Sequence, residues 1–520
     1  MSARHLLSNA LSGNFEAAVQ VFLNYKDGAQ DFEKNDEEAR LAFEHVVKTL
    51  KSSFYLNEIT IYNFKKILDF KMKFHQNLIV FVGENGVGKT SLLEAIRRNL
   101  MWIAATTRKE NTNGGSVDKD EINNNNKEKG AYIDCDFKIG SISNYKGRLA
   151  CPPDGIPSNL KSELTKYREL GRNFRILNDY ADIDLPLFSY YGIDRLQITG
   201  RKTKKMEFGK IDAYDQSLND KATFSTFVDW LIQMLKISKK NFNTVEKIKI
   251  ESQIEVLVNA GANIKDNPLY EVYEDLMSIL KIYPNNATKN KSKKTIELLE
   301  DLFRKIYPSL THIQLVNEDD GKDKVVLNLG DQSIYLHQFS DGQRVLLGLI
   351  GDIARRLILL NDALDNPFLG QGIVLIDEIE LHLHPSWQQK VVLILRQSFP
   401  NIQFIITTHS PHVITTVEPE CIRSIYMDSD RNKYSIPNFT KGAESNVVLE
   451  NVFYVDSRPQ DVDEVQWLER YIELVNEDQW DSEEAESLRH KLDVWGKNKE
   501  IELDKLDIEI SLKKLKRLKK

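Results

Sequence analysis

The sequence predicts an α/β fold built around a parallel sheet, and three observations predict it. The apolar run at 78–82 is followed at once by the glycine-rich loop GENGVGKTS at 83–91 and then by a helical pattern. Two later apolar runs, in GIVLIDE at 372–378 and in FIITTHS at 404–410, end in acidic residues and in a histidine. Strands buried on both faces are typical of a parallel sheet, and ligand groups gather at the carboxyl ends of such strands. We therefore expect one shared site.

The composition is that of an ordinary globular protein, with 520 residues, 41% hydrophobic, 28% charged and a formal net charge of −7. This length predicts about three to four domain-sized units. No run approaches the roughly 18 apolar residues of a membrane span, and His5, Ser8 and Asn9 interrupt the start of the chain. We therefore expect no membrane segment, no export signal and a cytoplasmic location. The three cysteines show no C-x-x-C spacing, which argues against disulfides or zinc.

Changes in pattern along the chain predict five parts. They are a helical cap at 1–50 that resembles a fragment of a tetratricopeptide or Sel1-like array, a first lobe at 51–200, a helical insertion at 201–310, a second lobe at 311–435 and a helical C-terminal interaction region at 436–520. Within the first lobe, the polar, low-complexity stretch 108–130 is predicted to be a mobile surface insertion without chemistry of its own.

The loop at 83–90 satisfies the phosphate-binding pattern G-x-x-x-x-G-K-[ST] between a predicted strand and a predicted helix. Its glycines would let successive backbone N–H groups turn toward a phosphate, while Lys89 reaches the β- and γ-phosphates and Thr90 ligates magnesium. A glycine turn that matches by chance is disfavoured by the flanking strand and helix. The loop residues assigned to ATP binding are Gly83, Asn85, Gly86, Gly88, Lys89, Thr90 and Ser91.

Three side chains at the ends of the later strands supply the remaining groups of an ATPase site. Asp377 can orient Mg²⁺ together with Thr90, and Glu378 can hold and activate the attacking water. His409 can sense the γ-phosphate as a switch. The alternative for the two acids is a solvated acidic turn, which the preceding apolar strand disfavours.

The motifs GENGVGKTS, FSDGQR, IVLIDE and TTHS, in that order, resemble the Walker A, signature, Walker B and switch-histidine motifs of ABC-type ATPase heads. The approach strand YLNEITIYNFKKILDF resembles that of the structural-maintenance and recombination branch. The resemblance covers about half of the chain and implies an α/β ABC-ATPase head, a P-loop NTPase, with an inserted helical subdomain and helical N- and C-terminal additions. It also implies a head-to-tail homodimer, in which Ser340, Gly342 and Gln343 complete the ATP site around the partner's Lys89.

Four positions depart from or only weakly match the family pattern. Asp341 replaces a glycine of the signature, Ile379 replaces the proline after the Walker B acids, and His384 stands where many heads carry an aspartate. Gln197 is a weak candidate for the glutamine of the Q-loop. These departures bear on the rate of hydrolysis more than on the fold.

The histidines near the acidic residues also allow a second interpretation, a metal site. The pairs His382-x-His384 and His409-x-x-His412 lie near two acids and could hold zinc or manganese. The resemblance to ABC heads already accounts for ELHLHP and THSPH as loops around the nucleotide, which favours the nucleotide reading.

The order of the five parts resembles the PtuA family, the ATPase subunits of Septu-type anti-phage systems, including retron-associated forms. The resemblance implies a chain that oligomerises, uses ATP as a gate and holds a separate HNH nuclease. Retron-linked members are also expected to bind a reverse transcriptase with its RNA–DNA hybrid. No intrinsic nuclease is expected, because 436–520 carries no convincing D-x-D at a strand end. The alternatives are a DNA-repair or recombination ATPase acting directly on DNA, and an ATP-binding scaffold without hydrolysis.

The C-terminal tail carries an apolar stripe on a predicted helix that ends in the basic run KKLKRLKK. The stripe consists of Ile508, Leu512, Leu515 and Leu518. A solvated helix end and a contact with a partner or nucleic acid are equally compatible with this pattern. Two further basic patches are predicted, at 201–205 and in a lysine-rich loop at 288–294.

Overall fold

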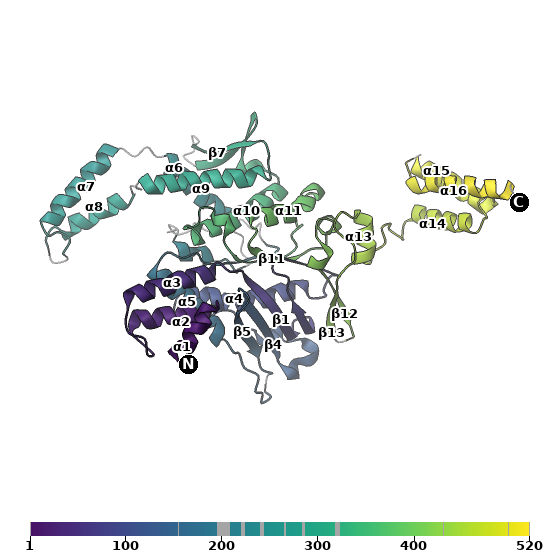
Figure 1. Ribbon diagram of the computed structural model, residues 1–520. Coiled ribbons are helices and arrows are strands. Elements are labelled where there is room, and N and C mark those ends of the chain that lie inside the picture. The colour runs from purple at the N-terminus through teal and green to yellow at the C-terminus, as the bar shows by residue number, and fades with distance from the viewer. Residues whose placement is uncertain are drawn as a thin grey trace. The chain divides into compact units, whose positions relative to one another are not determined.

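The structure is a computed structural model. It describes residues 2–153, 155–194, 209–219, 224–239, 244–264, 267–282, 286–317, 323–429, 431–497 and 499–518. The chain splits into a main unit, Met1–Gly442, and a C-terminal unit, Ala443–Lys520. Figure 1 shows both units and labels many of their helices and strands. No helix in the described part of the chain has the length and apolar character needed to cross a membrane.

A six-stranded sheet in the order β13-β12-β3-β11-β10-β6 forms the centre of the main unit. Its strands are β3 (Leu78–Val82), β6 (Leu187–Tyr191), β10 (Gly372–Ile376), β11 (Ile402–Thr407), β12 (Ile422–Asp428) and the antiparallel edge strand β13 (Arg431–Ser435). Every residue of β3, β6, β10 and β11 is buried, as expected for strands covered on both faces. The three strands predicted from apolar runs are confirmed.

A second, antiparallel sheet in the order β2-β1-β4-β5 packs beside the first. Its strands are β1 (Phe54–Phe64), β2 (Ile67–Lys73), β4 (Ala131–Ile139) and β5 (Ser143–Cys151). The buried side chain of Gln403 on β11 joins the two sheets, because it accepts a hydrogen bond from the N–H of Leu56 at 2.8 Å and donates one to the Leu56 carbonyl at 3.0 Å. Its amide thus satisfies backbone groups that would otherwise be buried without partners.

Helices cover these sheets. They are α4 (Lys89–Arg108), α5 (Thr165–Tyr180), α10 (Asp341–Leu360), α11 (Pro385–Ser398) and the short α12 (Pro411–Ile414). The 3-10 segments are η1 (Lys119–Glu121), η2 (Asn124–Lys129), η3 (Lys210–Tyr214), η4 (Leu336–Gln338), η5 (Pro367–Leu369) and η6 (Pro419–Cys421).

Three N-terminal helices of the main unit, α1 (Ala3–Leu11), α2 (Phe15–Asp27) and α3 (Asp36–Leu50), lie together (Figure 1). Asn14 and Asn35 cap α2 and α3 by accepting backbone hydrogen bonds, which explains where these helices begin. Phe15 anchors the group, since its N–H donates to Ser143 Oγ at 2.7 Å and its ring packs on Phe174 of α5. The segment 1–50, which was expected to be a helical cap, thus consists of three helices.

The stretch 108–130, expected to be a mobile insertion, instead packs along α4. The indole N–H of Trp102 donates to the Gly115 carbonyl at 2.6 Å, and Ile122 is buried. The carboxylate of Glu121 pairs with Arg98 and, at 3.4 Å, with Lys65. The stretch therefore makes specific side-chain and backbone contacts that its polar composition did not predict.

The helical insertion contains α6 (Phe224–Lys239), α7 (Thr244–Asn259), α8 (Tyr270–Ile282) and α9 (Asn286–Arg304). Helix α6 approaches α10 closely where α10 carries glycine, since a Cβ at Gly351 would lie 2.6 Å from the Phe227 ring. The lysine-rich stretch 288–294 was expected to be a loop, but it lies within α9, where Lys291 pairs with Asp362. The basic patch expected at 201–205 lies outside the described residues.

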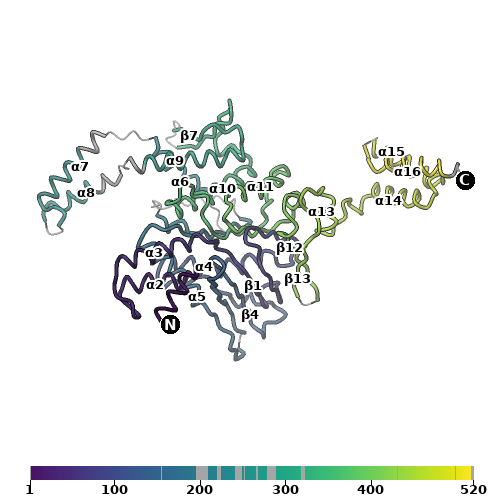
Figure 2. Tube along the Cα trace, in the orientation of Figure 1, coloured from purple at the N-terminus to yellow at the C-terminus, as the bar shows by residue number. Residues whose placement is uncertain are grey.

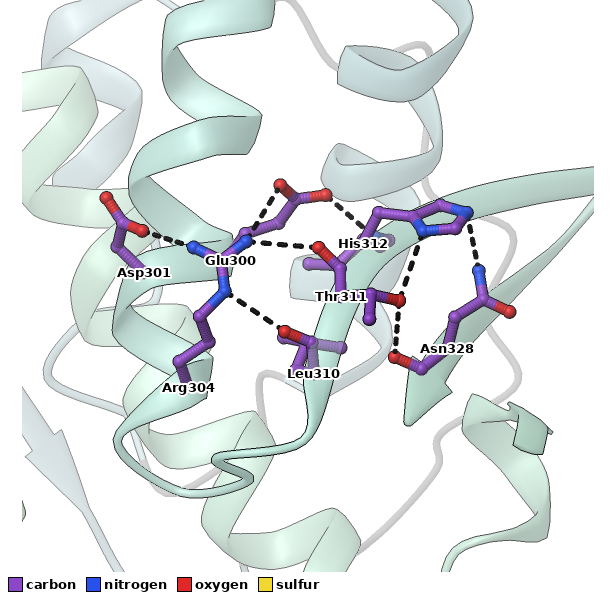
Figure 3. Close-up of polar contacts among 8 residues, drawn as sticks. Glu300, Asp301, Arg304, Leu310, Thr311, His312 and Asn328 are labelled. Carbon is purple, nitrogen blue, oxygen red and sulfur yellow. Dashed lines mark hydrogen bonds and ion pairs between the residues drawn. The ribbon is translucent and has the colours of Figure 1, made fainter. Parts of the chain in front are cut away.

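Helix α9 leads into a three-stranded sheet, β7-β8-β9, of strands β7 (Leu310–Asn317), β8 (Asp323–Leu329) and β9 (Gln332–Tyr335). Figure 3 shows that Arg304 at the end of α9 faces the start of β7. Its guanidinium donates to the carbonyls of Leu310 and Thr311, each at 3.0 Å, and Glu300 accepts from the N–H of Ile313 at 2.7 Å. The helix and the sheet are thus joined at this junction, and Figure 2 traces the chain onward toward α10.

The C-terminal unit contains α13 (Ser445–Val452), α14 (Asp463–Asn476), α15 (Glu483–Gly496) and α16 (Ile501–Leu518). The last three share a core that includes Leu468, Leu492 and Leu506. Ion pairs between Arg489 and Asp507 add to this core on its surface. The C-terminal region is helical, as the sequence predicted.

Candidate functional site

The pairing of the parallel strands brings the predicted motifs to one edge of the sheet. Ile376 of β10 is the register partner of Ile406 of β11, and Thr407 of β11 is the partner of Phe81 of β3. The loops that follow these three strands are therefore neighbours, at the carboxyl ends of the strands. The structure brings together the loop 83–90, Asp377, Glu378 and His409 in this way.

The phosphate loop has the backbone geometry that its glycines allow. Gly83, Gly86 and Gly88 have φ values of 142°, 84° and 103°, in the region that side chains disfavour. A Cβ at Gly83 would lie only 2.3 Å from the carbonyl oxygen of Ile425. The 20-residue helix α4 begins at Lys89, so its N-terminus points free N–H groups into the loop. Thr90 and Asn85 are exposed and Ser91 is half-buried.

Lys89 is the buried cation of the site. Its ammonium donates to the carbonyls of Gly83 and Glu84, each at 2.8 Å. Burial lowers the pKa of Lys89 to about 8, although the charges of Asp377 and Glu378 partly oppose the shift. A buried ammonium held on loop carbonyls gains from any anion that enters the loop.

Thr407 joins the Walker B strand to the neighbouring strand. Its hydroxyl donates to Asp377 Oδ1 at 2.5 Å and accepts from the N–H of Glu378 at 2.8 Å. Glu378 has a φ of 45°, a left-handed conformation that costs energy for a residue with a side chain. Asp377 is buried and Glu378 is partly exposed, so the two acids sit in different environments directly after one strand.

Glu380 is the site residue that the sequence analysis missed. Its carboxylate accepts hydrogen bonds from the hydroxyl of Thr408 at 2.7 Å and from the backbone N–H of His409 at 2.6 Å. Burial lowers the pKa of His409 below its ordinary value, and the charge of Lys89 adds to the shift, so the imidazole is neutral at pH 7. The sequence feature that could have identified Glu380 is its place as the third acid of IDEIE, two positions after Glu378.

The signature motif forms the N-terminus of α10. The hydroxyl of Ser340 accepts from the N–H of Gln343 at 3.4 Å, and the amide oxygen of Gln343 accepts from the N–H of Ser340 at 3.0 Å. This reciprocal pair is a capping box. A Cβ at Gly342 would lie 2.2 Å from the His382 carbonyl, so glycine is needed there for packing. Among the described residues, no hydrogen bond links Ser340 or Gln343 to the loop 83–90 of the same chain.

The departures and the alternative metal site have local explanations. His384 caps α11, where its Nδ1 lies 2.9 Å from Ser386 Oγ, and Asp341 pairs with Arg344. Within the described ranges, no group of three or more His, Cys, Asp and Glu residues could hold a metal ion, and this includes His382 and His412. Gln197 lies outside the described residues.

A buried charged cluster connects α10 to the Walker B strand. Asp352 accepts hydrogen bonds from Arg355 and Arg356, and from the hydroxyl of Tyr191 at 2.9 Å. Burial disfavours the charged form of Asp352, but the two arginines outweigh it and lower the pKa of this carboxyl. The Tyr191 carbonyl in turn accepts from the N–H of Asp377 at 2.9 Å. The helix that starts at the signature is therefore linked to the Walker B acids through Tyr191.

A parallel sheet with a phosphate loop, paired acids after the neighbouring strand and a capped signature helix define a P-loop ATPase domain of the ABC type. The predicted fold class is therefore confirmed. The chain belongs to the family described as "AAA domain, putative AbiEii toxin, Type IV TA system", whose model matches residues 78–415.

Among its relatives is a protein named retron Ec83 probable ATPase, from Escherichia coli, which is 29% identical over 93% of this chain and 92% of its own length. A Septu protein PtuA from Bacillus mycoides is 26% identical over 85% of this chain and 51% of its own length. The expected resemblance to Septu and retron ATPases is confirmed. A solved Smc head bound to the C-terminal winged-helix domain of ScpA is 15% identical and covers 73% of this chain and 97% of its own, with a TM-score of 0.39. The fold assignment rests on the strand order and the family match.

Proposed function

We propose that this chain is an ATP-binding and hydrolysing ABC-type ATPase of an anti-phage defence system, which oligomerises and gates a separate HNH nuclease. The observation that carries the ATPase part is the meeting of Lys89, Asp377, Glu378 and His409 at one sheet edge. The names of the retron and Septu relatives support the defence setting. A cytoplasmic location is part of the same proposal.

The residues of the site fit a nucleotide with Mg²⁺. The positive φ values of Gly83, Gly86 and Gly88 let the loop backbone turn around an anion, and the ammonium of Lys89 lies buried on loop carbonyls that a phosphate can replace. Thr90 and Asp377 would hold Mg²⁺, which neutralises negative charge on the phosphates when it is bound. Thr90 is exposed in the first turn of α4, and Asp377 is oriented by Thr407.

The proposed roles in hydrolysis follow from the environments of the acids. Glu378 is partly exposed and accepts a proton from the attacking water, whereas buried Asp377 orients the metal shell. Glu380 holds the backbone of His409, whose neutral imidazole senses the γ-phosphate. Asn85, Ser91 and the glycines of the loop bind the phosphates.

The signature residues Ser340, Gly342 and Gln343 are proposed to complete the ATP site of a second copy in a head-to-tail dimer. The exposed position of Ser340 at the start of α10 supports this role, because the positive end of the helix faces outward there. An HNH nuclease is the proposed effector, with a reverse transcriptase and its RNA–DNA hybrid as further partners in a retron setting.

Two experiments test the proposal, one on the purified full-length chain and one in the native cell. Nucleotide binding and phosphate release are compared for the wild type, Lys89→Ala and the control Lys48→Ala, which removes an exposed lysine of α3. We expect the first variant to lose binding and the second to match the wild type. If the wild type binds ATP without hydrolysing it, the chain is a non-hydrolysing scaffold. Hydrolysis that requires added DNA would favour a repair ATPase.

A tagged pull-down from the native cell, with and without ATP, should recover a small HNH nuclease, and recovery of DNA alone would contradict the gating role.

A further inference from the structure

A cavity lies at the amino ends of the central strands, on the edge of the sheet opposite the phosphate loop. Pro186, Gln371 and Asn401 line it, and they directly precede β6, β10 and β11. The first residues of these strands are register partners, so the strands begin side by side. Gln371 and Asp377 flank β10 and lie about 20 Å apart at roughly 3.3 Å per residue. The cavity is therefore separate from the ATPase site.

The walls of the cavity are mostly apolar and come from segments that are distant in sequence. Leu50 of α3, Phe54 of β1, Phe174 of α5 and Leu185 before β6 all contribute to them. The cavity has a volume of about 200 Å³, and an apolar cavity of roughly 150 Å³ holds a benzene molecule. Two of these four residues are phenylalanines, and aromatic rings pack favourably on one another. The cavity thus has the size and the lining for an aromatic ring with its substituents.

Asp184 is the acidic group of the cavity wall, and one of its oxygens has no partner among the described residues. Its Oδ1 is buried, and no residue in the described part of the chain donates a hydrogen bond to it. Lys210 donates instead to Asp182 and, at 2.6 Å, to the carbonyl of Ile183. Burial raises the pKa of Asp184, although the charges of Lys210 and Lys51 partly oppose the shift. A buried acceptor without a donor is unfavourable, so a ligand that brings N–H groups to this oxygen gains affinity.

The amide side chains on the wall hold the cavity in shape. The amide oxygen of Gln371 accepts from the N–H of Phe54 at 2.8 Å, and its amide nitrogen donates to the carbonyl of Leu50 at 3.2 Å. The amide nitrogen of Asn401 donates to the carbonyl of Leu369 at 2.6 Å. Asn401 and Leu369 are exposed, so the cavity opens to solvent at this point. Its walls are therefore joined to one another before any ligand enters, as is usual for binding pockets.

We propose that this cavity binds a flat aromatic molecule with an amidine-like pair of N–H donors, whose ring packs on the apolar walls and whose N–H groups donate to Asp184. A carboxylate accepts such a pair through two parallel hydrogen bonds, as it does from a guanidinium. Benzamidine is a simple molecule of this class, and guanine carries a similar pair of donors on one edge. The proposed site lies outside the ATPase centre and does not involve its residues.

Isothermal titration calorimetry of the purified full-length chain with benzamidine, and separately with guanosine, tests the proposal. We expect at least one of them to bind with a Kd below about 1 mM. Each compound has a matched analogue that lacks one of the N–H donors, benzamide for benzamidine and inosine for guanosine. The compound that binds should bind at least tenfold more tightly than its analogue. Absence of binding by both compounds would overturn the proposal, and so would an analogue that binds as tightly as its parent.

Substitutions test whether the bound compound lies in the cavity. Asp184→Asn removes the charge and one acceptor oxygen, and should weaken binding at least tenfold. Val47→Trp places a large side chain on the wall that α3 contributes, and should abolish binding. The matched control is Asp179→Asn, which removes an exposed carboxylate of α5 and should bind like the wild type. Unchanged affinity in Asp184→Asn would overturn the proposal, and this isosteric variant decides the question if Val47→Trp does not fold.

The result is independent of the ATPase proposal. Lys89→Ala should bind the compound with the affinity of the wild type, and saturating ATP should not displace it. Asp184→Asn should likewise bind ATP as the wild type does. Loss of the compound in Lys89→Ala, or its displacement by ATP, would place it at the phosphate loop and overturn the proposal.

Discussion

The carboxylate of Glu380 accepts a hydrogen bond of 2.6 Å from the backbone N–H of His409. One side chain thus joins the loop after β10 to the loop after β11, and a second bond from Thr408 at 2.7 Å completes the clasp. Hydrogen bonds to a charged acceptor are the stronger kind, so the clasp fixes the backbone that carries the imidazole. His409 therefore depends on an acid of the Walker B loop for its place.

Replacing Glu380 by alanine should slow ATP hydrolysis and leave ATP binding nearly unchanged. Misplacement of a catalytic group by about 1 Å costs on the order of 100-fold in rate, and we expect a loss of about 10- to 100-fold in kcat. Steady-state kinetics with a parallel binding titration measure the two effects. Thr408→Val breaks one bond of the same clasp, so the double variant should lose less than the product of the single losses. Equal kcat in Glu380→Ala and wild type would contradict the positioning role.

Glu378→Gln should keep ATP bound and slow its hydrolysis. The amide cannot accept the proton of the attacking water, and loss of a general base lowers the rate by about 100-fold or more. The ATP-bound head dimer should then accumulate, which sedimentation with and without ATP will detect. If the variant hydrolyses ATP as fast as the wild type, Glu378 is not the general base.

ATP affinity should fall as the pH rises above about 8. Burial lowers the pKa of Lys89 to about 8, so the ammonium that binds phosphate is present below this pH and is lost above it. Binding an anion restores the proton, so the apparent affinity should decrease by up to about tenfold per pH unit. Titration of a fluorescent ATP analogue across this range provides the measurement. Lys89→Arg keeps its charge, and any binding that this variant retains should be flat over the same range.

Gly342→Ala should abolish the ATP-dependent head dimer while each chain still binds nucleotide. The added methyl group would lie 2.2 Å from the His382 carbonyl, so the start of α10 must shift away from the loop after β10. His337→Ala, an exposed position shortly before the motif, is the control and should dimerise normally. Sedimentation of Gly342→Ala with ATP should give monomer; a dimer would mean that the signature tolerates the shift.

Asp352→Asn should destabilise the main unit by about 3–5 kcal/mol, because it removes the carboxylate that compensates Arg355 and Arg356 in a fully buried cluster. The midpoint of urea unfolding reports the change. Asp362→Asn is the matched control, since it breaks only the surface pair with Lys291 and should cost less than about 1 kcal/mol. Similar losses of stability in both variants would show that Asp352 does not compensate the charges of Arg355 and Arg356 as described.

The sequence predicted the central strands well, because buried parallel strands leave unbroken apolar runs such as 78–82. It also predicted which residues would meet at the sheet edge, because each run ends directly in its polar motif. Glu380 and Thr407 were missed, since their roles depend on the alignment of β10 with β11, whose paired residues are about 30 positions apart. No local pattern encodes that alignment.

Amino-acid composition gave no sign of the tertiary contacts in two segments. The stretch 108–130 reads as low-complexity sequence, yet Ile122 and Glu121 each find a partner on the surface of α4 and β1. The lysine-rich residues 288–294 read as a loop, although lysine is a good helix former and the stretch lies in the first turns of α9. In both cases the tertiary partner, which is distant in sequence, decides the structure.

The junction closed by Arg304 has a consequence for how the head can change over evolution. Because Arg304 and Glu300 fix the start of β7 by contacts made within the junction itself, the sheet that leads to Ser340 does not rely on α7 or α8 for its geometry. The junction should therefore keep its geometry without these two helices. Replacing α7 and α8 by a short glycine-serine linker should leave the capping box of Ser340 intact. The connection between α6 and α9 can then vary in length and sequence without a change in the geometry of the signature helix.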